Sequence, residues 1–142
     1  MFAPPTQKHM KCLVPAAVLT LVGVLIAPVA FARIAKNTID PLAVVTDNGR
    51  HLIVTGPMVC TLGERAYLRV TVTQRSTGAV AEGGAVIACT GNTQQWQVLA
   101  AIQGNETFQP GPAAAVAIAR TTSRGETTDA HQWLVNITLV GE

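Results

Sequence analysis

Two histidines, each close to an aspartate, are the side chains of this sequence best spaced to bind a metal ion. His51 follows Asp47, and His131 follows Asp129; imidazole and carboxylate groups together suit several divalent metals. In a strand, Asp129 and His131 would point to the same side, because side chains two residues apart share a face. Both histidines, however, lie at predicted strand starts beside polar turns, where such residues usually belong to the rim of a sheet. We therefore predict no metal site and no cofactor.

Nucleophilic and acid–base catalysis have few candidates. The two serines after residue 32, Ser76 and Ser123, lie at turns, and neither stands in the G-x-S-x-G pattern of a hydrolase. Paired carboxylates could hydrolyse glycosidic bonds, but the available glutamates lie in or beside turn-like segments, where acidic side chains are ordinarily solvated. These glutamates are Glu64, Glu82, Glu106 and Glu126. The sequence has no glycine-rich nucleotide-binding motif and no zinc-type cysteine spacing. We therefore predict that the protein is not an enzyme.

The first 32 residues have the composition of a secretory signal peptide. Lys8 and Lys11 form a short positive region ahead of an uncharged apolar run, residues 13–32. The run ends in Ala30-Phe31-Ala32, the small-x-small pattern that signal peptidase accepts. We expect cleavage after Ala32 and a secreted or cell-surface protein. The alternative is a retained membrane anchor, because about 20 apolar residues can just span the hydrocarbon layer of a bilayer.

Removal of residues 1–32 leaves eight basic and eight acidic side chains, so the mature chain is formally neutral. A neutral chain with scattered charges has no electrostatic footprint for nucleic acid or for anionic lipid. We expect an extracellular protein, a glycan or a small molecule as partner. The membrane would be contacted only through the signal segment, if that segment is not cleaved.

Strand-forming stretches recur between turn signals from residue 42 onward. Residues 33–41 are expected to form a linker, and residues 42–142 one domain. The clearest strand has alternating apolar residues from Ala66 to Val72. Asn48-Gly49 predicts a hairpin, and Gly83-Gly84 predicts a bulge or a close backbone approach. The expected strands are residues 42–47, 51–60, 65–75, 80–89, 95–103, 113–122 and 131–139.

Seven short alternating strands in about 110 residues are typical of an all-β fold, an immunoglobulin-like antiparallel β-sandwich that follows the N-terminal signal peptide helix. A short helix over residues 113–119 is the main local alternative, because that stretch is rich in alanine. Tryptophan rings should lead the core, since each can bury about 150–250 Å². The predicted core includes Trp96, Trp133, Leu68, Val70, Val98, Ile137 and Leu139.

Cys60 and Cys89 are the two cysteines left after cleavage. Two cysteines in a small exported domain usually pair, so we predict a disulfide that joins the end of the 51–60 strand to the end of the 80–89 strand. On the chain-entropy relation, a loop of about 30 residues closed in this way adds roughly 3–4 kcal/mol of stability.

Several short runs carry a resemblance to a known family. They are Val54-Thr55-Gly56-Pro57-Met58-Val59-Cys60, Val70-Thr71-Val72-Thr73-Gln74, Cys89-Thr90-Gly91 with Trp96, and Gly111-Pro112-Ala113. In these runs the chain resembles an uncharacterised family of small secreted immunoglobulin-like β-sandwich proteins from actinomycetes and related bacteria. The resemblance covers most of residues 42–140. It implies a fold and brings no activity with it.

The predicted function is that of a secreted or cell-surface, non-enzymatic β-sandwich module with a binding or structural role. The outward side of the 65–75 strand offers Tyr67, Arg69 and Arg75, residue types that binding surfaces prefer; the loop at residues 104–111 is a second possibility. The alternative is a secreted small-molecule carrier resembling chromoprotein apoproteins. An apolar pocket of at least roughly 300 Å³ in the mouth of the sandwich would favour the carrier, and a filled core would favour the module.

Overall fold

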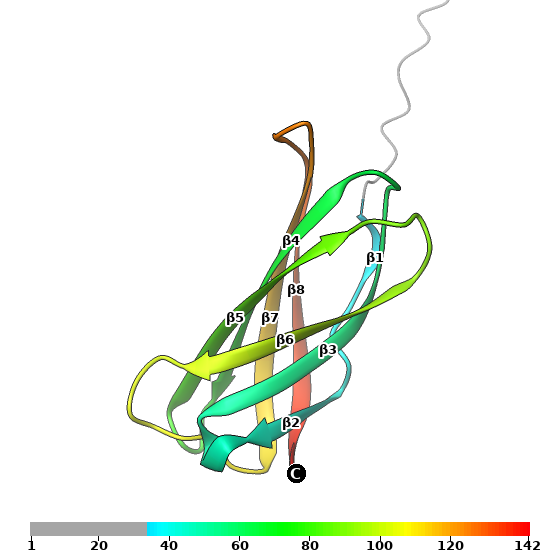
Figure 1. Cartoon of the computed structure of the whole chain (residues 1–142). Helices are drawn as coiled ribbons and strands as arrows, with labels where there is room; N and C mark the ends of the chain where they lie inside the picture. The colour runs from blue at the N-terminus through cyan, green and yellow to red at the C-terminus, as the bar shows by residue number, and fades with distance from the viewer. Residues whose placement is uncertain (1–33) are drawn as a thin grey trace, which may run out of the picture. The chain divides into compact units, whose positions relative to one another are not determined.

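The computed structural model describes residues 34–142 (Figure 1). The predicted signal peptide and its cleavage after Ala32 lie outside the described residues. In the described part of the chain, no helix has the length and hydropathy needed to cross a membrane. The predicted all-β fold of the domain is confirmed, because every regular element among residues 34–142 is a strand apart from one short 3-10 turn, η1.

Eight strands follow one another along residues 34–142. They are β1 (Ile34–Asn37), β2 (Leu42–Thr46), β3 (His51–Cys60), β4 (Arg65–Gln74), β5 (Ala79–Ala88), β6 (Gln94–Ile102), β7 (Gly111–Ser123) and β8 (Glu126–Gly141), with η1 (Asp47–Gly49) between β2 and β3. Residues 113–119 lie within β7, so the helical alternative for this stretch is wrong. Strand β1 forms inside the segment that we expected to be a linker, and it pairs with β3.

The strands close into a barrel, which corrects the prediction of two separate packed sheets. Hydrogen bonds connect β3, β2, β8, β7, β4, β5 and β6 in that order, and β6 pairs back with β3. Strand β1 pairs with the same edge of β3 as β2 does: β2 pairs with the start of β3, and β1 pairs with its end. The pairing is antiparallel except between β2 and β8, so the expected antiparallel pairing holds for most of the ring. Sequence patterns identify strands but not the neighbour on each edge, so this closure could not be seen in the sequence.

The pairing is dense in two parts of the ring and thin between them. Strand β4 pairs with β5 along its whole length and with β7 along most of it, and β3 pairs with β6 from His51 to Met58. In contrast, β5 meets β6 only at Ala81 and Glu82, and β2 meets β8 only at the β8 residues Thr138 to Gly141. The ring therefore consists of two paired sheets joined at two narrow seams.

A second contact, away from the paired residues, reinforces each seam. Cys60, the last residue of β3, forms the predicted disulfide with Cys89, which directly follows β5; their Cα atoms are 5.3 Å apart. On the other side, the backbone N–H of Ile34 in β1 donates a hydrogen bond to Oδ2 of Asp129 in β8, at 3.0 Å. One seam is thus clamped covalently and the other by a charge-assisted hydrogen bond.

The interior is filled by apolar side chains that alternate along the strands. Six of the seven predicted core residues are buried, and Trp133 is the exception because it is only partly buried and packs against the core edge. At the height of Trp133, β8 has β7 on one side and, within residues 34–142, no ladder partner on the other. The aromatic ring therefore stacks on His131, with centroids 5.6 Å apart, instead of entering the core.

Glycines permit one close backbone approach in the barrel wall and one tight turn. The register of β4 and β5 runs through Gly83 without a shift, so no bulge forms there. A Cβ at Gly83 would lie 2.4 Å from the carbonyl oxygen of Leu99, which confirms the close backbone approach. The predicted hairpin at Asn48-Gly49 also forms; Asn48 and Gly49 have φ values of 55° and 83°, as such turns require.

Candidate binding surface

The three residues predicted to form a binding surface lie on one side of the barrel. Tyr67 and Arg69 alternate along β4 with buried residues, so both point to solvent. Arg75 follows the end of β4 and lines a hollow on the same side, together with Thr73. We call the solvent side of the paired strands β5, β4, β7 and β8 the outer sheet face.

Strand register adds residues that the sequence analysis did not identify. Arg120 of β7 lies directly opposite Tyr67 of β4, and its guanidinium carbon is 5.0 Å from the centroid of the tyrosine ring, a cation–π contact. Ile118 of β7 lies opposite Arg69. These partners are about 50 residues apart in the chain, so only the observed pairing of β4 with β7 could identify them.

Large aliphatic side chains are exposed on the same face. Leu134, Val86 and Ile118 are 71%, 60% and 49% exposed, respectively. Val86 lies opposite Tyr67, and Leu134 lies opposite Val116. Ile118 and Leu134 are diagonal neighbours on the paired strands β7 and β8, within reach of each other. The outer sheet face therefore combines an aromatic ring, arginines and unburied aliphatic groups.

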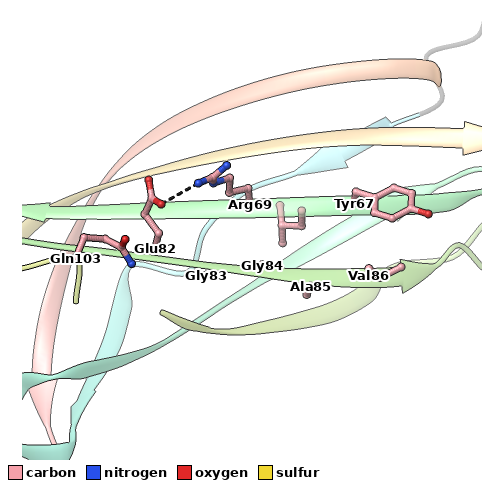
Figure 2. Close-up of a pocket in the computed structure, with 9 residues that line it drawn as sticks. Tyr67, Arg69, Glu82, Gly83, Gly84, Ala85, Val86 and Gln103 are labelled. Atoms are coloured by element: carbon pink, nitrogen blue, oxygen red, sulfur yellow. Dashed lines mark hydrogen bonds and ion pairs between the residues drawn. The ribbon is translucent and has the colours of Figure 1, made fainter. Parts of the chain in front are cut away.

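A shallow hollow of about 610 Å³ lies over β4 and β5. It exists because Gly84, which points outward opposite Arg69, has no side chain. Figure 2 shows Tyr67 and Arg69 along the same strand, with Arg69 reaching Glu82; Nη2 of Arg69 donates to Oε2 of Glu82 at 2.8 Å. Val86 makes the floor of the hollow apolar. Arg69 supplies a hydrogen-bond donor and Glu82 an acceptor on its walls.

A second hollow, of about 580 Å³, lies over β4, β7 and β8. Arg75 and Asn136 contribute polar groups to its wall, and Val116 and Leu134 contribute apolar ones. Both hollows open on the outer sheet face. The outer sheet face thus carries two open hollows and not one enclosed pocket.

Charge is distributed unevenly over the described residues. Four of the seven basic side chains in residues 34–142 lie on the outer sheet face, whereas only one of the eight acidic side chains, Glu82, does. Within this part of the chain Arg65, Arg75 and Arg120 form no ion pair. Residues 34–142, which carry one more acidic than basic side chain, therefore have one electropositive face, which a net charge cannot reveal.

The two histidine–aspartate pairs considered as metal ligands are not brought together. Nδ1 of His51 lies 3.0 Å from Oδ2 of Asp47, and Nε2 of His131 lies 2.9 Å from Oδ2 of Asp129. His51 begins β3, whereas Asp129 is bonded to Ile34, which pairs with Cys60 at the other end of β3. Residues 34–142 contain no group of three or more potential metal ligands.

Asp129 is the one described group with a clear shift of its pKa. Burial raises the pKa of this carboxyl, but hydrogen bonds from the backbone N–H groups of Ile34 and Ala130, together with the neighbouring His131, outweigh burial and hold the pKa below its usual value. The charge of Asp129 therefore serves the attachment of β1 to β8.

The loop at residues 104–111 packs against the end of the barrel. Phe108 is buried, and its backbone N–H donates to the carbonyl oxygen of Gly49 at 2.9 Å. The buried amide of Gln74 bonds both the N–H and the carbonyl oxygen of Gln109, at 2.9 and 2.8 Å. A hollow of about 410 Å³ at this end is lined by Phe108 and by turn and C-terminal residues. Phe108 thus fills the mouth of the barrel.

Comparison with protein-family models finds no match to this chain, and comparison with curated proteins finds none either.

Proposed function

We propose that this chain is a secreted or cell-surface binding module without catalytic activity, and that it engages its partner through the outer sheet face. The observation that carries the proposal is the convergence of Tyr67, four arginines and exposed aliphatic side chains on one paired sheet. Aromatic residues and arginine are enriched in protein interfaces, and they supply most of the residues whose loss weakens binding strongly.

The exposed aliphatic groups argue against an ordinary solvated strand face. Valine and isoleucine can be kept on an exposed strand for their β-propensity alone. Leucine has no such preference, yet Leu134 is the most exposed aliphatic residue on this face. Contiguous exposed apolar groups with a polar rim are typical of interaction sites. Leu62 and Leu99 are also exposed, but Leu134 is a diagonal neighbour of the exposed Ile118. A partner that covers this pair explains the presence of Leu134 on this face.

The filled barrel supports the module over the small-molecule carrier. The interior is occupied by buried side chains, including Phe108 at the end where a carrier would admit its ligand. The hollow of about 410 Å³ at that end is open and lined largely by polar residues such as Thr46, Asp47 and Asn48, so it is not the apolar pocket that a carrier requires. The hollows on the outer sheet face are open and shallow, which suits a broad partner better than an enclosed small molecule.

Export and an immunoglobulin-like architecture remain parts of the same proposal. The Cys60–Cys89 disulfide fits an oxidising exterior. Dense pairing within two groups of strands, with thin seams between them, supports a sandwich of the immunoglobulin-like kind whose corners have joined. In such domains the sheet faces and the end loops are the usual binding surfaces.

Affinity capture tests the proposal. The full-length chain is expressed in a secreting host, immobilised as the host processes it, and incubated with medium and surface extract from cultures of its own source. The double variant Ile118→Ser/Leu134→Ser should capture at least about tenfold less of the partner than the wild type, since interface anchors each contribute 1 kcal/mol or more.

Leu99→Ser is the matched control. Leu99 is 58% exposed, but it lies on β6, outside the outer sheet face. This variant should capture as the wild type does, and all three proteins should unfold within a few degrees of one another. Equal capture by the double variant, or loss of capture in Leu99→Ser, would contradict the proposed surface.

A further inference from the structure

We propose that the partner meets the outer sheet face with an acidic segment of protein, whose carboxylates pair with Arg65, Arg75 and Arg120 and whose apolar side chains cover Ile118 and Leu134. This inference rests on the proposed function and adds the chemistry of the partner. It is carried by charge: the face has four arginines and one glutamate, although the described residues as a whole are slightly acidic.

The position of the arginines calls for a ligand that is both long and negatively charged. Arg65 and Arg120 are diagonal neighbours across β4 and β7; Arg120 lies opposite Tyr67, and Arg65 lies two residues before it. Arg75 lies ten residues further along from Arg65, about 30 Å at the rise of an extended strand. No single small anion can contact both ends of such a row. Several charges spaced along one macromolecule can.

Arginine is suited to carboxylates in particular. Its planar guanidinium binds a carboxylate through two parallel hydrogen bonds, whereas lysine offers a single point charge. All four basic residues of the outer sheet face are arginines. Arg69 already forms an ion pair with Glu82 through one hydrogen bond, which leaves Arg65, Arg75 and Arg120 for an external anion.

The aliphatic groups between the arginines favour a protein over an anionic polysaccharide or a nucleic acid. Burial of Ile118 and Leu134 needs apolar side chains on the other side, because removing aliphatic groups from water is favourable only against an apolar surface. Sugar and phosphate backbones offer few such groups. A second copy of this chain is disfavoured for a face-to-face contact, because the arginines of one copy would meet the arginines of the other.

Titration with synthetic probes tests the inference. The probe is a twelve-residue peptide with glutamate at alternate positions and leucine or serine between them; its control has glutamine in place of every glutamate. Binding to the secreted, ¹⁵N-labelled protein is followed by amide chemical shifts. We expect the acidic peptide to bind at least about tenfold more tightly than the control, with shifts confined to β5, β4, β7 and β8, and to weaken severalfold between 50 and 300 mM salt.

Two arginine variants sharpen the same titration. Arg65→Gln/Arg120→Gln should weaken binding of the acidic peptide about tenfold, since each exposed charge contributes a modest, severalfold share of the affinity. Arg50→Gln, whose side chain pairs with Asp47 near η1, should leave binding unchanged. Equal binding of the two peptides would overturn the inference, as would tighter binding of polygalacturonate or duplex DNA with the same arginine dependence, or self-association that Arg65→Gln/Arg120→Gln abolishes.

The native capture experiment separates this inference from the proposed function. Capture that is lost in Ile118→Ser/Leu134→Ser but kept in Arg65→Gln/Arg120→Gln overturns the acidic partner and leaves the binding surface standing. Capture that is insensitive to both variants overturns both. Loss in both variants, with normal unfolding temperatures, supports both.

Discussion

The inner and outer faces of the same four strands follow different rules. On the inner side of β4 and β7, small and medium apolar residues such as Ala66, Val70 and Ala117 are fully buried, and their sizes are explained by the space between the strands. On the outer side, arginines alternate with exposed Ile118 and Leu134, and no packing requirement of the described chain accounts for them. The inner face therefore determines stability, and the outer face is free to carry a binding function.

The largest expected effect comes from removing the covalent link between the two paired sheets of the barrel. In Cys60→Ala/Cys89→Ala the disulfide that joins the end of β3 to the end of β5, and so clamps the seam between β5 and β6, is lost. We expect the free energy of unfolding to fall by about 3–4 kcal/mol, because the unfolded chain regains the entropy of a closed loop. Denaturant titration measures this change. A loss below about 1 kcal/mol would mean that the ladder alone holds this seam.

Two adjacent glycines compare the faces within one strand. Gly83→Ala should destabilise the protein by roughly 2–3 kcal/mol, because the added Cβ would meet the backbone of Leu99. Gly84→Ala, on the outer side, places its Cβ 3.1 Å from the carbonyl oxygen of Leu68, so a cost below about 1 kcal/mol is expected. Thermal unfolding of both variants checks the order, and equal losses would contradict the difference between the faces.

Asp129 gives the clamp between β1 and β8 a pH dependence. Its pKa is lower in the folded protein than in the unfolded chain, so its contribution to stability is complete above the ordinary aspartate pKa. The contribution is lost as the pH falls through the lowered, folded pKa. Unfolding measured between pH 6 and pH 2 should show a steeper acid loss for the wild type than for Asp129→Asn. Parallel curves would remove Asp129 from the clamp.

The smallest expected effect lies on the outer sheet face. Arg120→Ala removes the cation–π contact with Tyr67, which contributes about 0.5–1 kcal/mol at an exposed site. We expect a shift in unfolding free energy within that range and a much larger loss of partner binding. A double-mutant cycle with Tyr67→Leu isolates the contact. A coupling energy well above this range would show that Arg120 serves stability more than binding.

The sequence predicted those features that depend on residues close together in the chain, and it did not predict those that depend on pairing between distant strands. Alternation along residues 65–75 correctly separated inner from outer positions, and it placed Tyr67 and Arg69 on solvent. Arg120, Ile118 and Leu134 could not be added, because their neighbourhood depends on the register of β4, β7 and β8, which no local pattern encodes.

The partial burial of Trp133 and the formation of strand β1 could not be predicted from local patterns for the same reason. Trp133 shares the alternation of the core residues of β8, yet it is only partly buried, because none of the strands in the described part of the chain pairs with that part of β8 on its second side. Strand β1 reads as a polar segment, but Ile34 is buried and bonds Asp129, 95 residues away. In both cases partners distant in sequence decide the outcome.

Hydroxyl-radical footprinting tests the central claim most directly. Side-chain oxidation of the secreted protein is compared with and without the partner-containing medium of its source. We predict that Tyr67, Ile118 and Leu134 become protected, while the equally exposed Leu62 and Leu99, which lie off the outer sheet face, do not change. Protection at Leu99 with none at Ile118 and Leu134 would contradict the assignment of the outer sheet face as the binding surface.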